Sequence, residues 1–117
     1  MSTEQLEQIE QLARRAVACK RWRWMDGMLY KQDGVGVRPV IATAPIIQGG
    51  GLPDLTDPAT LGCLLALVRE AHRDQQAHIV KLIHDLTGWQ AWGSETYIAP
   101  KGSTEAEALV AALEAAP

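Results

Sequence analysis

Apolar residues recur at helical spacing in three parts of the chain, which predicts a helix near each end and one in the middle. Residues 2–18 combine an apolar stripe with three early glutamates and two later arginines, as an amphipathic helix does. In the middle helix, the positions from Leu61 to Val68 are apolar almost all the way round, so we expect it to be buried. Residues 104–114 open on a capping box and continue with an apolar face.

The middle helix has a clear start signal. Asp57 can accept hydrogen bonds from the first free amides of a helix, and Pro58 then falls at the first helical position, where its missing N–H costs nothing. Gly62 and Ala66 lie on a neighbouring strip of this helix, where a second backbone could approach closely. We therefore expect a helix–helix or subunit contact there.

Between the first two helices the pattern changes to strand periodicity. In residues 20–30, Trp22 and Trp24 alternate with Arg21 and Arg23, which predicts a strand with indoles on one face and guanidinium groups on the other.

A second strand is predicted at residues 35–43, following a turn at residues 32–34. Pro39 within it favours the edge of a sheet, because proline cannot donate a ladder hydrogen bond. Residues 44–55 contain three consecutive glycines and two prolines, so we expect a loop. It lacks the lysine and the serine or threonine of a phosphate loop.

Residues 78–85 fit a short helix by spacing and a strand by their β-branched content, and we favour the strand. Trp89 and Trp92 lie in the next predicted strand, and residues 95–99 can add a further short one.

The predicted order is therefore α–β–β–α–β–β–α in a single domain, residues 1–117. This order indicates an α+β fold in which an antiparallel sheet of about four strands is covered by a buried central helix and by the N- and C-terminal helices.

Charge is unevenly distributed along the chain. The net charge of −3 argues against a general DNA-binding protein, and no apolar run is long enough for a membrane helix. Residues 14–38 nevertheless hold seven basic residues against two acidic ones. A locally basic segment in an acidic protein suits a small anionic ligand or an acidic partner surface, although a merely solvated face would look the same.

No catalytic or metal motif is evident. The histidines at 72, 78 and 84 match no common metal-ligand spacing, and Cys19 and Cys63 give no disulfide framework. We therefore predict no metal, no cofactor and no enzymatic activity, and two reduced thiols in a cytoplasmic protein.

Four tryptophans without any phenylalanine are the unusual feature of the composition. Each indole can simply fill the core, or it can stack on a nucleobase beside arginines that neutralise phosphate. Arg69 and Arg73, one turn apart at the end of the middle helix, either complement the helix dipole or clamp a phosphate. The candidate ligand-binding residues are Arg23, Trp24, Met25, Met28, Arg69, Arg73 and Trp92.

Three blocks together resemble a family of small phage and prophage proteins of largely unknown function. They are WRWMDGM (residues 22–28), PDLTDPATLGCLLALVREA (residues 53–71) and TEAEALVAALE (residues 104–114), and the middle block is the most specific. This chain departs from the family pattern at Asp26, where a proline is expected, and in the His/Gln-rich stretch after Ala71. The resemblance implies a phage-encoded protein of the host cytoplasm.

Small phage proteins of this kind often act against host defence, and in size and expected fold the chain is similar to anti-Thoeris proteins that sequester immune signals. This implies a homodimer or higher homo-oligomer that binds a cyclic nucleotide or cyclic ADP-ribose type signal without cleaving it. Two other functions stay open: a protein-binding inhibitor or phage accessory protein whose basic segment meets an acidic partner, and a small enzyme that degrades the signal.

Overall fold

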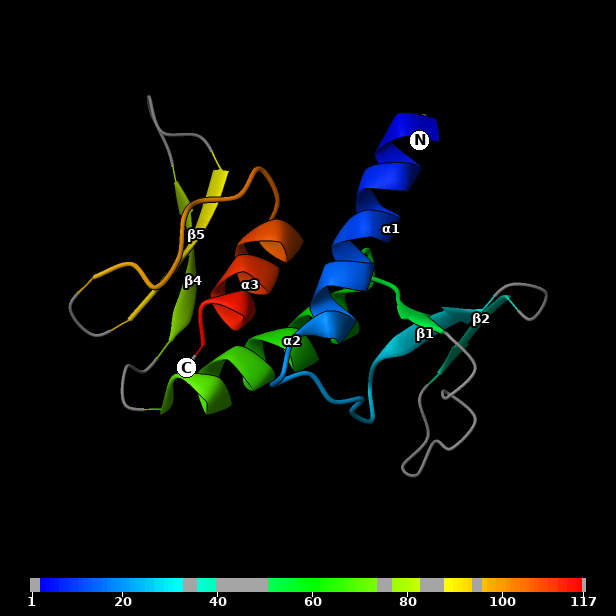
Figure 1. Ribbon diagram of the computed structural model, residues 1–117, viewed down its shortest axis with the longest axis horizontal. Helices are drawn as coiled ribbons and strands as arrows, with labels where there is room; N and C mark the ends of the chain where they lie inside the picture. The colour runs from blue at the N-terminus through cyan, green and yellow to red at the C-terminus, as the bar shows by residue number, and fades with distance from the viewer. Residues whose placement is uncertain are drawn as a thin grey trace.

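Three helices separate two small antiparallel sheets (Figure 1). The computed structural model describes residues 3–32, 36–39, 51–73, 77–82, 88–93 and 96–116. Within them the chain forms α1 (Thr3–Ala18), β1 (Leu29–Gln32), β2 (Gly36–Pro39), β3 (Leu52–Pro53), α2 (Pro58–Ala71), β4 (His78–Leu82), β5 (Gly88–Trp92) and α3 (Glu105–Glu114). The predicted α+β class is confirmed, as are all three predicted helices.

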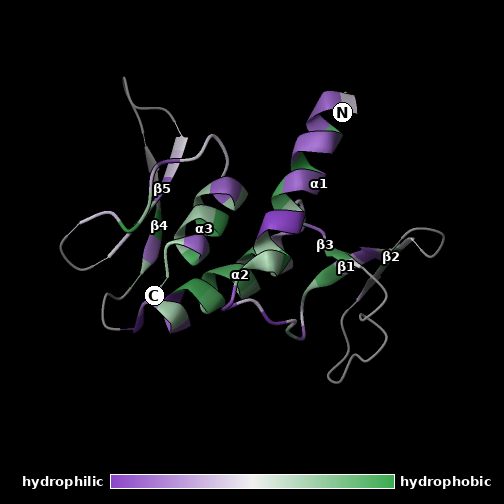
Figure 2. Ribbon diagram, viewed as in Figure 1, coloured by the Kyte–Doolittle hydropathy of each residue, from purple (hydrophilic) through white to green (hydrophobic). Residues whose placement is uncertain are grey.

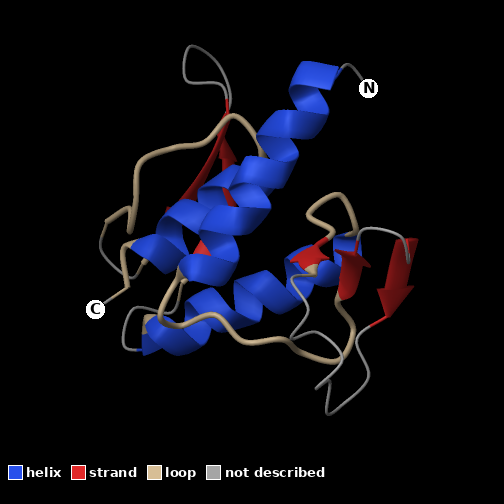
Figure 3. Cartoon of the chain, turned by 45° about the vertical axis from the view of Figure 1, so that its right-hand side comes forward, coloured by secondary structure: helices blue, strands red, loops and turns tan. Residues whose placement is uncertain are grey.

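The strands do not form one sheet of about four strands, as the sequence suggested. They form a three-stranded sheet in the order β2-β1-β3 and a separate β4-β5 hairpin, which lie on opposite sides of the helices (Figure 3). Strand β1 pairs with β2 along one edge and with β3 along the other, so it has no edge left for β5. The free edge of β5 is filled instead by residues 97–102, through Trp89, Ala91 and Gly102 backbone groups at 2.8 Å.

Helix α3 is the most enclosed helix. It packs against α1, α2 and β5. Its fully buried side chains include Leu109, Val110 and Leu113. Figure 2 shows α2 and α3 as largely hydrophobic and α1 as largely hydrophilic. The prediction that α2 is buried all round is wrong: Leu64, Leu67 and Val68 lie in the core, whereas Gly62 and Ala66 are exposed.

Both predicted helix starts are confirmed. Asp57 accepts hydrogen bonds from the backbone N–H and the hydroxyl of Thr60, each at 2.9 Å, and Pro58 follows it. Thr104 accepts the N–H of Glu107 at 3.1 Å. The carboxylate of Glu107 reaches back to the Ser103 hydroxyl at 2.8 Å.

Residues 19–28 form turns and irregular backbone, so the strand predicted over residues 20–30 is confirmed only at its end, where β1 begins. Trp22 N–H bonds to Cys19 at 3.1 Å and Met28 N–H to Met25 at 3.2 Å, which closes two turns. Gly27 has φ 101°, a conformation that favours glycine. The period of two survives in the exposure of the side chains, since Trp22 and Trp24 are half-buried while Arg21 and Arg23 are exposed.

The second half of the chain follows the prediction more closely. Residues 78–82 are a strand, as favoured, and β5 carries both Trp89 and Trp92. Residues 96–99 make only an isolated bridge, between Tyr97 and Trp92, instead of a further strand. Strand β2 contains Pro39 and lies at a sheet edge, as predicted.

Several predictions lie wholly or partly outside the described residues. These are the turn at residues 32–34, the second half of the strand at 35–43, most of the loop at 44–55 and the segment 83–85. Among the described residues, none of the helices has the length and apolar character needed to cross a membrane.

Candidate functional site

The first tryptophan pair is built into the fold. The Trp22 and Trp24 rings meet edge to face with centroids 5.3 Å apart, and Trp24 meets Tyr30 in the same way at 6.2 Å. Both indoles are half-buried against the hydrophobic core. Such pairs contribute about 0.5–1.5 kcal/mol beyond the area they bury. Trp24 therefore lies between two other rings and anchors the loop of residues 19–28.

The two candidate methionines belong to the same packed region. Met28 has no exposed surface and is among the largest fully buried side chains. The core encloses it, so in this structure Met28 has no surface that a ligand could contact. Met25 is half-buried against the core.

Arg23 leaves this loop and reaches the end of α2. Its Nη1 lies 2.6 Å from a carboxylate oxygen of Glu70, and each side chain is about half exposed, at 52% and 47%. An exposed ion pair of this kind contributes only about 0–1 kcal/mol. Its main consequence is positional, because Glu70 is the neighbour of Arg69. The contact brings Arg23 to the same end of α2 as two other candidate residues.

Arg69 lies in the last turn of α2, whereas Arg73 lies just beyond the helix, which ends at Ala71 with His72 as its C-cap; both arginines are exposed. Arg69 Nε donates a hydrogen bond of 2.9 Å to the carbonyl of Ala77, the residue before β4. This bond fixes the guanidinium beside the start of the hairpin, where Figure 1 shows the end of α2. We refer to Arg23, Arg69 and Arg73 as the basic corner.

Trp92 lies close to the basic corner. In the β4-β5 register it faces His78, which directly follows Ala77. Paired residues of an antiparallel ladder have Cα atoms about 4.5–5.5 Å apart. Trp92 is half-buried, and its ring meets Tyr97 edge to face at 6.2 Å. The structure thus brings four of the seven candidates, Arg23, Arg69, Arg73 and Trp92, to one region and leaves the others in or against the core.

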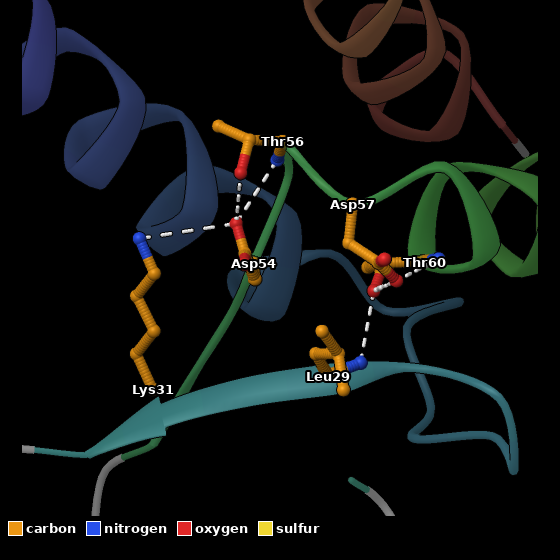
Figure 4. Close-up of polar contacts among 6 residues, drawn as sticks. All are labelled: Leu29, Lys31, Asp54, Thr56, Asp57 and Thr60. Atoms are coloured by element: carbon orange, nitrogen blue, oxygen red, sulfur yellow. Dashed lines mark hydrogen bonds and ion pairs between the residues drawn. The ribbon is translucent and has the colours of Figure 1, made fainter. Parts of the chain in front are cut away.

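The polar cluster at the start of α2 is structural (Figure 4). The Thr60 hydroxyl accepts the N–H of Leu29 at 2.8 Å and donates to Asp57, so it joins β1 to the helix cap. The Asp54 carboxylate accepts the hydroxyl of Thr56 at 2.6 Å and lies 3.8 Å from Lys31. These groups satisfy one another across a short connection, which is what a rigid junction requires.

A groove of about 370 Å³ lies between α1 and the start of α3. Its lining mixes apolar side chains with polar and charged groups of both signs: Gln8, Ile9, Gln11, Leu12, Arg15, Ser103, Thr104 and Glu107. Arg15 forms two hydrogen bonds with Glu114, which raise its pKa above the ordinary value. Ser103 and Glu107 also pair with each other. The charged groups of the groove are therefore largely committed within the protein.

Both cysteines are free and half-buried. Burial raises the pKa of the Cys19 thiol and of the Cys63 thiol, so both are poorer nucleophiles than an exposed cysteine. The described part of the chain contains no group of His, Cys, Asp and Glu side chains able to hold a metal ion.

Comparison with known protein families, with curated proteins and with solved structures finds no match for this chain. The site therefore rests on its geometry. Two of its residues escaped the sequence interpretation. Glu70 could have been found from the sequence, since it lies beside Arg69 and three residues before Arg73. Tyr97 could not, because its exposure depends on how residues 96–102 lie along β5.

Proposed function

We propose that this protein binds a small anionic, nucleotide-like ligand at the basic corner and retains it without cleaving it. The observation that carries the proposal is the hydrogen bond from Arg69 to Ala77, which fixes a guanidinium one residue away from the His78–Trp92 pair. A guanidinium near the strand pair that carries an aromatic residue offers partners for the two halves of a nucleotide, its phosphate and its base.

The local charge favours an anion despite the negative net charge of the chain. Among the described residues of the corner, three arginines stand against the carboxylate of Glu70. The C-terminal end of a helix adds roughly half a negative charge, which repels phosphate. Two full charges on Arg69 and Arg73 outweigh it. Arginine is suited to the role because its planar fork donates two parallel hydrogen bonds to phosphate oxygens.

The arginines of this corner suit retention without cleavage. Arginine side chains stay protonated and serve poorly as general bases. Cys63 lies two turns along α2 from Glu70, and burial raises the pKa of its thiol. The resemblance to small phage proteins suggests the setting, the host cytoplasm, where retention would deplete a cyclic nucleotide or cyclic ADP-ribose type immune signal.

Titration calorimetry with cyclic ADP-ribose and with a cyclic dinucleotide tests the proposal. We expect a measurable affinity for one of them that falls about 100-fold in the Arg69→Ala/Arg73→Ala double variant, since each hydrogen bond to a charged group contributes about 1.5–3 kcal/mol. Arg14→Ala is the matched control, because Arg14 is an exposed arginine paired with Glu10 on α1. An equal loss in the control, or recovery of a cleaved product after heating the complex, contradicts the proposal.

A second candidate function, docking onto an acidic protein, is favoured by the exposure of Lys20, Arg21 and Arg23 on the loop of residues 19–28. It predicts that a host protein copurifies with the chain and that the small-molecule fraction of a lysate is unchanged. Native mass spectrometry of protein purified from a cell with active nucleotide signalling separates the two functions. A bound nucleotide supports retention, and a bound host protein supports docking.

A further inference from the structure

The β4-β5 hairpin presents different faces to the core and away from it. Ala91 is 1% exposed and Ile79, its partner in the register, packs against the core. Successive residues of a strand point to opposite faces, so His78 and Trp92 point away from that core. The bridge between Trp92 and Tyr97 places Tyr97 on the same outer face.

Tyr97 is the exposed member of the aromatic pair on this face. Its side chain is 55% exposed, whereas Trp92 is half-buried. The two rings stand at 79° to each other. In such an edge-to-face arrangement one ring supports the other without covering both faces of it. The more exposed ring therefore keeps surface for a further planar group.

The backbone on both sides of Tyr97 is fixed. Gly93 N–H donates to the carbonyl of Thr96 at 2.7 Å, and Ile98 N–H donates to the carbonyl of Ala91 at 2.8 Å. The side-chain amide of Gln90 also donates to the carbonyl of Ala99, at 3.2 Å. An exposed aromatic ring held in this way loses little conformational freedom on binding, which is what a preorganised contact requires.

We infer that Tyr97 is the stacking residue of the ligand site, with Trp92 as its support. This inference rests on the proposed function and narrows its ligand class. The ligand is then a nucleotide with an accessible planar base, which lies on Tyr97 while its phosphate meets Arg69 and Arg73. A sugar phosphate without a base meets only the arginines.

Binding of two probes to two variants tests the inference. ADP-ribose carries a base, and ribose 5-phosphate does not. We expect Tyr97→Leu to weaken ADP-ribose binding tenfold or more and to leave ribose 5-phosphate binding unchanged, since stacking of one base contributes on this scale. Tyr97→Phe keeps the ring and should bind both probes within about twofold of the natural chain. Val37→Ala is the control, because Val37 is an exposed apolar residue on β2.

A measurement on the unaltered chain removes any dependence on how a variant folds. The chain has two tyrosines, and Tyr30 is buried at 5% exposure. With tyrosine rings isotopically labelled, titration with ADP-ribose should shift the NMR signals of Tyr97 and leave those of Tyr30 in place. Ribose 5-phosphate should shift neither set.

The outcomes separate the inference from the function beneath it. If Tyr97→Leu binds ADP-ribose as tightly as the natural chain while Arg69→Ala/Arg73→Ala does not, the stacking role is wrong and the phosphate site stands. If the natural chain binds neither probe, the inference is overturned; if it also binds neither cyclic ADP-ribose nor the cyclic dinucleotide, the proposed function is overturned as well.

Discussion

The two tryptophan pairs of this protein are similar in sequence and different in structure. Trp22 and Trp24 lie in irregular backbone and meet each other and Tyr30, so their rings are occupied by the protein itself. Trp89 and Trp92 lie in a strand, and their odd spacing places them on opposite faces of the hairpin. Trp92 then lies beside an exposed tyrosine and opposite His78, the residue after the carbonyl group that Arg69 contacts. Aromatic residues next to arginines thus indicate a binding surface only where the backbone leaves a ring free.

The largest expected effects come from removing one tryptophan of each pair and comparing stability with ligand affinity. Trp24→Ala should lower the free energy of unfolding by about 3 kcal/mol, the low end of the cost for removing a buried aromatic ring, because Trp24 is only half-buried. It should lower ligand affinity no more than the severalfold expected for displacing Arg23, which lies on the loop that Trp24 anchors. Trp92→Ala should instead weaken ADP-ribose binding tenfold or more through the lost support of Tyr97. Chemical denaturation and calorimetry on both variants check this, and loss of binding in Trp24→Ala alone would reverse our assignment of the two pairs.

A change at the junction of β1 and α2 should have an intermediate effect on stability. This junction lies at the end of the molecule that holds Trp22 and Trp24. Thr60→Val keeps the shape of a fully buried side chain and removes the hydroxyl that joins Leu29 N–H to Asp57. The cost should be about 1–3 kcal/mol, because a partly buried N–H loses its acceptor. Hydrogen exchange should show faster exchange at Leu29 and little change in β5. Unchanged exchange at Leu29 would mean that the hydroxyl is not its acceptor in solution.

The smallest effect is expected where the two regions meet. Arg23→Ala removes an exposed ion pair with Glu70 and should change the free energy of unfolding by less than about 1 kcal/mol, less still in high salt. If Arg23 also contacts phosphate, ADP-ribose affinity falls severalfold at low salt. A stability loss comparable to that of Trp24→Ala would show that Arg23 packs as part of the loop.

The sequence predicts the helices well because each has a local signal. Asp57, Pro58 and Thr104 fix helix starts through short-range contacts, and the structure confirms them. It predicts the sheets less well, because pairing depends on distant segments. Nothing local shows that β1 has both edges filled, or that residues 97–102 close the edge of β5.

The candidate site shows the same division. The sequence shows Arg69 and Arg73 four residues apart, but the helical turn predicted between them is not formed, because α2 ends at Ala71. The different surroundings of Trp24 and Trp92 cannot be recognised from the sequence, because alternating exposure arises both in a strand and in a loop that lies against a helix. Met28 illustrates the limit, since a residue in a motif of arginines and tryptophans turns out to be fully enclosed.

The segment that closes the edge of β5 also protects this protein from aggregation. Residues 97–102 supply backbone partners to Trp89 and Ala91 and lead directly into α3, the most enclosed helix. Gly88 lies so close to Gly102 of this segment that it has no room for a side chain. A Cβ at Gly88 would lie 2.5 Å from the Gly102 carbonyl oxygen. If this segment is detached, open donors and acceptors of β5 face solvent beside the apolar surface that α3 had covered, which is the geometry that promotes association between chains. We therefore expect the last twenty or so residues to limit association between chains as well as to contribute to the core.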